Sequence, residues 1–242
     1  MLKILFSPAE GKNSGGNAQK KELFGATNAR DEILQEYNNI ILSKDKEMIK
    51  GLFGMKKFTD CEVYINDIFD SELMPAIERY SGVAYEYLDI NSLTQIQKEY
   101  LRNNTIIFSN LYGPIFGGDT ISNYKVKQGN SIGKIAVDKF YKDRFSYQLD
   151  LYLAQDDILD LRAGYYDKFY KINNPYTTLK FLKNGKTVSH WAKAYRGIVL
   201  REIAKNNIQS IKEFMALEID GLSIEEIKVI KNKTQIIYNI KE

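Results

Sequence analysis

Residues 189–197 carry the pattern with the most chemistry, Ser-His-Trp-Ala-Lys-Ala-Tyr-Arg-Gly. On a helix, Lys193, Arg196 and Gly197 stand at i, i+3 and i+4 and therefore share one face. Two like charges on one face are unfavourable unless an anion or an acidic partner neutralises them, and the next acid in the chain is Glu202. A glycine inside a helix costs about 1 kcal/mol relative to alanine. The presence of Gly197 therefore indicates that a ligand or another backbone approaches the helix closely at this position. This face is predicted to bind an anion, and a helix packed tightly on a neighbour is the alternative.

His190, the single histidine, precedes this face. It is a candidate general acid or base, because histidine ordinarily titrates near neutrality. A hydrogen-bonded structural histidine at a strand end is the competing interpretation. Ser189 would point to the opposite face of a continuing strand, so the two residues are not assigned as a dyad.

Two further polar loops follow apolar strands, at residues 7–12 (Ser-Pro-Ala-Glu-Gly-Lys) and 109–114 (Ser-Asn-Leu-Tyr-Gly-Pro). Ligands commonly bind where parallel strands end, which makes both loops candidate sites. The glycine spacing of a nucleotide-hydrolysing phosphate loop is absent. The resulting candidate catalytic residues are Ser7, Glu10, Tyr112, Asp119 and His190, and Lys12 joins the candidate anion contacts. Tyr124 beside Lys125 and Lys127 offers a stacking surface next to cations, which suits nucleic acid.

Strands and helices are predicted to alternate along the chain. Period-2 and apolar runs predict strands at 2–6, 105–108, 158–161, 177–182, 187–191 and 235–240. The Asn184-Gly185 pair predicts a hairpin over 177–191, followed by a helix over 192–206. Residues 9–28 are predicted to be a loop, and a helix is predicted from Asp31 to about residues 51–54. Further helix starts are predicted at Ser71, at Ser92 with Gln95, and at Ser210 with Glu213. The fold class is predicted as α+β, that is mixed α/β, in a single compact domain over residues 1–242.

Composition narrows the possible function classes. The 242 residues are 44% hydrophobic and 27% charged, as in ordinary globular proteins. No apolar stretch is long enough to span a membrane, and the apolar run at residues 1–6 is too short for the apolar region of a secretion signal. A cytoplasmic location is therefore expected. One cysteine and one histidine cannot form a disulfide or a Cys/His zinc site, so no cofactor and no metal site is predicted. Cys61 lies between Asp60 and Glu62, which disfavours its thiolate and a role as peroxide sensor.

The net charge of +3 is small, but the charges are unevenly distributed. Residues 60–100 carry nine acidic and two basic side chains, whereas residues 180–205 carry seven basic side chains and one acidic. A basic segment of this kind attracts phosphate, although solvated lysine surfaces are also common.

Together, the three motifs and the segment Tyr80-Ser81-Gly82-Val83-Ala84-Tyr85 resemble the YaaA family of peroxide stress resistance proteins. The resemblance implies a YaaA-type fold and a cytosolic protein made under hydrogen peroxide stress. It also implies lower free iron, less oxidative DNA damage, and DNA binding through a positively charged cleft and a helix-hairpin-helix element. Residues 49–57 are the expected place of that element, with Lys56 and Lys57 as phosphate contacts. The chain departs from the family at Phe116-Gly117, where an arginine and a proline are usual, and at Asn123-Tyr124-Lys125, where Pro-Tyr-Arg is usual.

Two functions remain from this reasoning. The first is a peroxide-stress protein that binds double-stranded DNA through its phosphate backbone, largely independently of sequence, and so limits iron-dependent oxidative damage. Its predicted contacts are Lys12, Lys56, Lys57, Lys125, Lys127, Lys193, Arg196 and Gly197. The alternative is an enzyme acting on a phosphorylated or carboxylated small molecule in one pocket formed by the three motifs. Direct iron sequestration is the least favoured option, because the acidic segment lacks Glu-x-x-His spacing.

Overall fold

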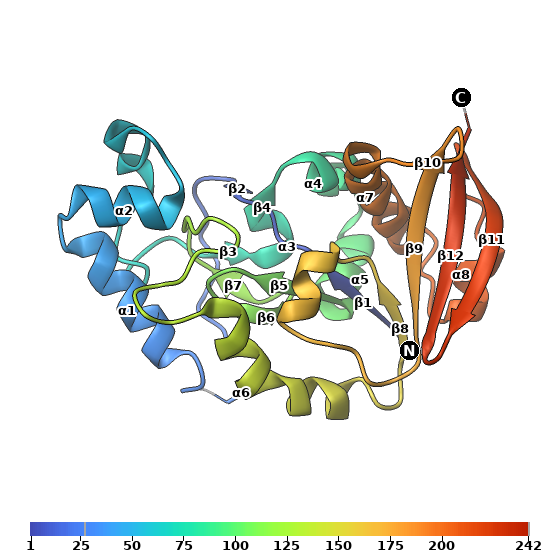
Figure 1. The fold of residues 1–242 in the computed structure, drawn as a ribbon, viewed down its shortest axis with the longest axis horizontal. Coiled ribbons are helices and arrows are strands. Elements are labelled where there is room, and N and C mark those ends of the chain that lie inside the picture. Colours follow the sequence, from blue (N-terminus) through green and yellow to red (C-terminus); the bar gives the residue numbers. More distant parts are fainter. Residues whose placement is uncertain (27, 242) are drawn as a thin grey trace.

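A mixed sheet forms the centre of the molecule (Figure 1). The computed structural model describes residues 1–26 and 28–241, and the side chains of Ser189 and His190 lie outside this description. Within these residues the main sheet has eight strands in the order β11-β12-β9-β8-β1-β5-β6, with β10 paired to β9. The strands are β1 (Leu2–Phe6), β5 (Thr105–Ser109), β6 (Gly113–Phe116), β8 (Asp157–Asp160), β9 (Tyr176–Lys183), β10 (Lys186–Thr187), β11 (Leu222–Ile230) and β12 (Lys233–Ile240).

The central strands run parallel. β1 pairs with β5 on one side and with β8 on the other, β8 pairs with β9, and β9 pairs with β12. Every residue of β1 and β5 is buried, as expected for strands covered on both faces. Two short pairs anchor the chain around this sheet, β2 (Gly11–Lys12) with β4 (Tyr80–Ser81) and β3 (Met74–Pro75) with β7 (Thr120–Ile121).

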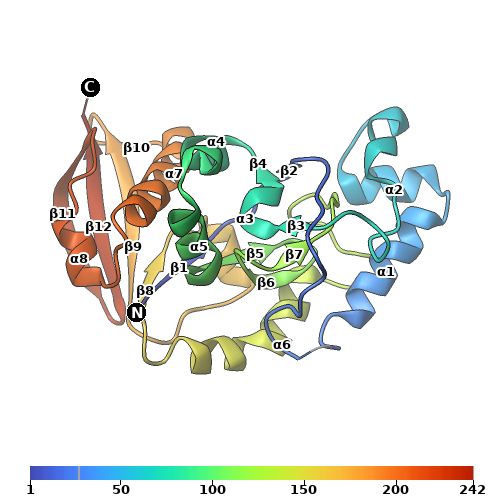
Figure 2. The ribbon, with the colours of Figure 1, turned by 180° about the vertical axis from the view of Figure 1, so that it is seen from behind.

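Helices cover both faces of the sheet (Figures 1 and 2). The helices α4 (Val83–Leu88), α5 (Gln95–Asn104) and α7 (Ser189–Lys205) lie on one face, and α6 (Val137–Tyr152) and the 3₁₀ turn η4 (Gly164–Lys168) lie on the other. The helices α1 (Asp31–Leu42) and α2 (Lys46–Phe53) form one end of the molecule, and α8 (Ile211–Ala216) packs near the other. The remaining helical segments are α3 (Ala76–Arg79), η1 (Phe58–Asp60), η2 (Glu62–Tyr64) and η3 (Ile90–Ser92).

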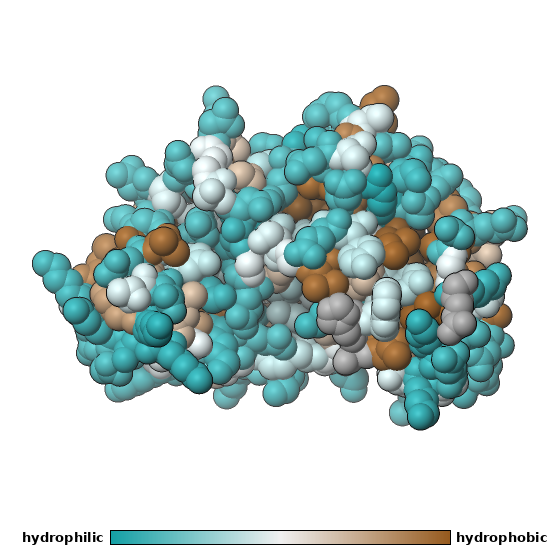
Figure 3. Space-filling model, turned by 90° about the horizontal axis from the view of Figure 1, so that it is seen from above, coloured by the Kyte–Doolittle hydropathy of each residue, from teal (hydrophilic) through white to brown (hydrophobic). Residues whose placement is uncertain are grey.

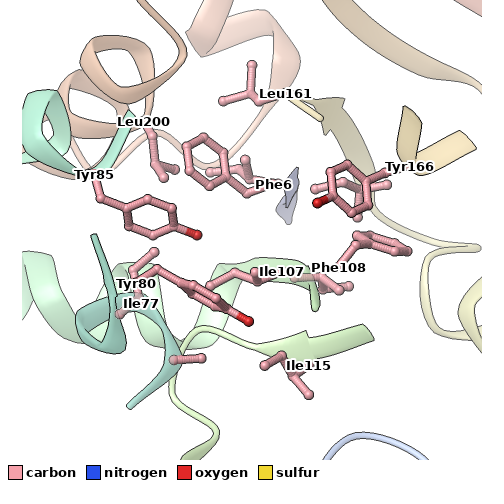
Figure 4. Packing of buried hydrophobic residues seen from close by; sticks show 14 of the residues in the cluster. Phe6, Ile77, Tyr80, Tyr85, Ile107, Phe108, Ile115, Leu161, Tyr166 and Leu200 are labelled. Carbon is pink, nitrogen blue, oxygen red and sulfur yellow. The ribbon is translucent and has the colours of Figure 1, made fainter. Parts of the chain in front are cut away.

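The core beneath α4 and α7 is rich in aromatic side chains (Figure 4). Phe6 at the end of β1 meets Tyr85 of α4 edge to face, with ring centroids 5.5 Å apart. Tyr85 and Tyr166 lie on opposite sides of Phe6 with their hydroxyls turned toward the space between them. This packing fixes α4 and the η4 turn against the end of β1.

The mixed α/β class is confirmed, and so are the strands at 2–6, 105–108, 158–161, 177–182 and 235–240 to within about two residues at their ends. The hairpin is confirmed too, since Asn184 and Gly185 have φ of 51° and 71° and β9 pairs with β10. The Ser210 cap is confirmed because its hydroxyl accepts a hydrogen bond from the Glu213 N–H.

Four predicted boundaries were wrong. The helix from Asp31 breaks after Leu42, because Lys44 has φ of 65° and Asp45 caps a new helix, α2. The helix predicted after Ser71 is preceded by β3 and begins only beyond Pro75. The capping box uses Thr94 and Gln97 rather than Ser92 and Gln95. The strand predicted over 187–191 stops at Thr187, and α7 begins at once.

No helix in the described part of the chain is both long and apolar enough to cross a membrane.

Candidate functional site

A cavity of about 380 Å³ opens where β1, β5 and β8 end. Parallel strands end at one edge of the sheet, and this edge is where ligands bind in such folds. Ser7 follows β1, Asn110 follows β5 and Leu161 follows β8, and all three line the cavity. Its other walls come from the β2–β4 pair, α4, the η4 turn and α7; the further lining residues are Phe6, Pro8–Gly11, Ser81–Tyr85, Gln128, Ala163, Tyr166, Lys193 and Arg196.

Two cations from α7 stand at this cavity. Lys193 is exposed and Arg196 is partly buried, one helical turn further on. Burial lowers the pKa of Arg196, and the charge of Asp160 opposes that shift. Among the described residues neither side chain makes a hydrogen bond or an ion pair. The cavity mouth therefore presents two positive charges that an anion can neutralise.

Gly197 has a different role from its cationic neighbours. A Cβ at this position would lie 2.0 Å from the carbonyl oxygen of Ala84, so α7 crosses the backbone of α4 there. Of the two reasons predicted for this glycine, the structure shows the close approach of another backbone.

Ser7 lines the cavity and also holds its wall together. Its hydroxyl accepts a hydrogen bond from the Ala163 N–H at 2.8 Å, and its carbonyl accepts one from the Tyr85 hydroxyl at 2.9 Å. These contacts join the loops after β1 and β8 to α4. The catalytic role predicted for Ser7 stays a prediction.

Glu10 lies at the rim of the cavity and contacts two lysines, Lys125 through its carboxylate and Lys12 through its backbone carbonyl. Its carboxylate pairs with the Lys125 ammonium at 3.2 Å, and Lys125 is only 9% exposed. The ammonium of Lys12 donates to the carbonyl oxygens of Ala9 (3.4 Å) and Glu10 (3.3 Å) and lies 3.9 Å from the centre of the Tyr124 ring. Burial, followed by repulsion from Lys125, lowers the pKa of Lys12 well below its ordinary value. Both lysines are thus engaged inside the protein.

Tyr112 and Asp119 do not line this cavity. The hydroxyl of Tyr112 shares a 2.7 Å hydrogen bond with Ser122. The carboxylate of Asp119 accepts hydrogen bonds from the N–H groups of Phe116 (2.9 Å) and Phe24 (3.3 Å), beside a separate hollow of about 540 Å³. Burial raises the pKa of Asp119. The side chain of His190 lies outside the described residues, so its place relative to the cavity is not assigned.

Three exposed lysines gather at the end of α2. Lys56 and Lys57 follow the left-handed turn at Gly54 (φ 67°), and the side-chain stem of Lys127 lies against that glycine. Lys127 is followed by Gln128, which lines the cavity. After α2 the chain forms two three-residue 3₁₀ turns, η1 and η2, rather than a second α-helix, so the helix-hairpin-helix detail is not confirmed. Figure 3 shows that the face carrying α2 and α7 is mostly hydrophilic.

The side chain of Phe116 packs against two other aromatic rings. Its ring lies 5.3 Å from the ring centres of both Phe24 and Tyr152. Aromatic packing therefore stands where the family resemblance led us to expect a cation.

Asn110 is the residue that sequence reasoning missed. It is 5% exposed, its Oδ1 accepts a hydrogen bond from the Tyr166 hydroxyl at 3.3 Å, and it lines the cavity. Its position directly after the apolar strand β5 was the available signal.

Cys61 is expected to react poorly with peroxide and with thiol reagents. It is fully buried, and burial, followed by the charge of Asp60, raises the pKa of its thiol. Because the thiolate is the reactive form, labelling by a disulfide reagent at neutral pH should be more than about tenfold slower in the native protein than in urea. Equal rates, or a sulfenic acid trapped at low peroxide concentration, would contradict this expectation.

Comparison with known proteins gives a consistent result. Residues 2–228 match the family model described as "Peroxide stress protein YaaA". An "Uncharacterized protein" of Campylobacter jejuni is 42% identical over 99% of both chains. A "UPF0246 protein" of Corynebacterium efficiens is 30% identical over 83% of this chain and 84% of its own length, and one of Fusobacterium nucleatum is 24% identical over 93% and 94%.

Proposed function

Because the chain belongs to the peroxide stress protein YaaA family, we propose that it binds double-stranded DNA in the cytoplasm through phosphate contacts. The observation that carries the proposal is the pair Lys193 and Arg196, which have no hydrogen-bond or ion-pair partner among the described residues. The exposed lysines Lys56, Lys57 and Lys127 add positive charge beside the end of α2, and α2 and α7 both lie on the upper side of the molecule in Figure 1. Phosphate contacts of this kind position a protein on DNA without reading its sequence.

Such binding also offers a physical link to iron. Cations condense on the phosphate backbone, and a protein that neutralises phosphates releases them. A ferrous ion held at DNA is one such cation, and its displacement would move iron-dependent oxidation away from the bases. The protein is thus proposed to limit oxidative DNA damage without itself sequestering iron.

The double variant Lys193→Ala/Arg196→Ala is expected to bind duplex DNA at least about tenfold more weakly at low salt, since each lost charged contact is worth on the order of 1 kcal/mol or more. Its plot of log affinity against log salt should be shallower by about 2, because each phosphate contact contributes about 0.9 to the slope. Fluorescence anisotropy of a labelled duplex across a salt series measures both quantities.

The matched control is Lys139→Ala/Lys142→Ala, which removes two exposed cations from α6 on the opposite side of the sheet. This variant should retain most of the affinity. An equal loss in both double variants would show that only net charge matters, and unchanged binding in the Lys193/Arg196 variant would reject these contacts.

The cavity supports a second candidate function, an enzyme acting on a phosphorylated or carboxylated small molecule. It brings Ser7 and Glu10 together with Lys193 and Arg196, as a site for an anionic substrate requires. If the wild-type protein fails to bind duplex DNA at low salt, these cations serve a ligand of the cavity and the second candidate is favoured.

A further inference from the structure

The cavity has an unused hydrogen-bond donor at the end of β5. Asn110 is 5% exposed, and its Oδ1 is occupied by the Tyr166 hydroxyl. Among the described residues its Nδ2 group makes no hydrogen bond, although the residue lines the cavity. The donor is not among the buried side-chain atoms that lack a partner, so it is accessible from the cavity, where a ligand with a carbonyl oxygen can accept its hydrogen bond.

The walls around this donor suit a flat ring. Phe6, Tyr85 and Tyr166 contribute aromatic side chains to the lining, and Pro8, Ala9 and Val83 contribute apolar ones. Burial raises the pKa of Tyr85 and of Tyr166, so both present neutral phenols. Aromatic and apolar walls of this kind favour a planar heterocycle over a sugar or an extended chain.

The mouth supplies the complementary charge. Lys193 and Arg196 stand on one face of α7 and line the same cavity as Asn110. Arginine and lysine are the usual contacts for phosphate oxygens. A ligand that meets all three features has a phosphate, a planar ring and a carbonyl on that ring.

We infer that the cavity binds a single nucleotide, with its base between the aromatic walls, a base carbonyl on Asn110 and its phosphate on Lys193 and Arg196. The volume of about 380 Å³ falls within the range of small-molecule sites. The nucleotide comes from one of two sources, the free nucleoside monophosphate or an unpaired nucleotide turned out of a DNA strand. This inference goes beyond duplex binding and does not require it.

Asn110→Asp tests the base contact with a near-isosteric change. It replaces the Nδ2 donor by an oxygen and keeps an acceptor for Tyr166, so a base carbonyl would meet a repelling oxygen. One arm titrates guanosine 5′-monophosphate, with inorganic phosphate alone as the reference. The other arm compares a fully paired duplex with the same duplex carrying one unpaired guanosine.

In one of the two arms, the wild-type protein should bind the preferred ligand at least about tenfold more tightly than Asn110→Asp does. Preference for the free nucleotide over phosphate identifies a metabolite, and preference for the unpaired guanosine identifies DNA as the source. The matched control Asn103→Asp, an exposed asparagine of α5, should retain the preference. If Asn110→Asp does not fold, Ala163→Leu, which fills the cavity from the loop after β8, should abolish the same preference.

The inference is overturned if phosphate binds as well as the nucleotide and the duplexes bind equally, or if Asn110→Asp and Ala163→Leu leave the preference unchanged. Salt-dependent binding of the paired duplex by all variants would then leave the DNA-binding proposal standing. Conversely, nucleotide binding without duplex binding would reject that proposal and keep the cavity assignment.

Discussion

Replacing Arg162 with alanine is expected to lower the free energy of unfolding by about 3–5 kcal/mol, the largest stability effect we predict. The side chain of Arg162 is 1% exposed. Its guanidinium donates to both carboxylate oxygens of Asp160, at 2.8 and 3.0 Å, and to the carbonyl oxygens of Tyr166 and Tyr170. Alanine would leave a buried carboxylate and two buried carbonyl groups without these partners, and such losses dominate the cost.

Urea denaturation followed by circular dichroism measures this change. Arg162→Lys should give an intermediate loss, because an ammonium keeps the charge but not the planar fork. Arg144→Ala is the matched control, since Arg144 pairs with Glu32 in an exposed position and should contribute about 1 kcal/mol at most. A loss at Arg162 no larger than at Arg144 would contradict the prediction.

The Arg162→Ala substitution should also disturb the cavity described above. Arg162 lies between two cavity-lining residues, Leu161 and Ala163, and holds the η4 turn that carries Tyr166. Ligand binding by the variant should therefore weaken even where it remains folded.

Replacing Gly197 with alanine is expected to cost about 1–3 kcal/mol, the usual range for an overpacked contact. The added Cβ would lie 2.0 Å from the Ala84 carbonyl oxygen and 3.1 Å from the Leu88 nitrogen, both backbone atoms that cannot rotate away. The better helix propensity of alanine offsets about 1 kcal/mol of the strain. The two helices must therefore move apart.

Gly51→Ala is the matched control, because it is also a helical glycine but a Cβ there would meet nothing within 4 Å. It should stabilise the protein by up to about 1 kcal/mol. Opposite signs for the two variants in urea denaturation are the expected result, and a stabilised Gly197→Ala would refute the close crossing. Separation of α4 from α7 should also weaken anion binding, since Ala84 and Arg196 line the cavity from these helices.

Several elements of the fold could be predicted because their signals are local. Leu2 to Phe6 is a continuous apolar run ended by Ser-Pro, and it forms a fully buried strand. Asn184-Gly185 tolerates positive φ and forms the expected turn. The predictions failed where a local signal had close competitors, as with Thr94, which caps α5 two residues after Ser92.

The contacts of the basic side chains show what local sequence patterns cannot predict. Lys12 and Lys125 belong to polar, loop-like segments, yet the first lies over the ring of Tyr124 and the second pairs with Glu10. Glu10 and Lys125 are far apart in the chain, so neither contact has a local signature. Lys193 and Arg196 both line the cavity from α7, as residues that share one helix face can, and their anion-binding role stays a prediction.

The sequence by itself determined the family, the mixed α/β class and the loops that carry polar groups after β1 and β5. Only the tertiary structure decided which of these groups meet. Strand order in the sheet is not chain order, since β1 pairs with β5 on one side and β8 on the other. Parallel pairing brings Ser7, Asn110 and Leu161 to one edge, while Asp119 is fixed elsewhere by the N–H groups of Phe116 and Phe24. The physical reason is that parallel strands join through long crossovers, whose closure depends on packing across the whole core rather than on neighbouring residues.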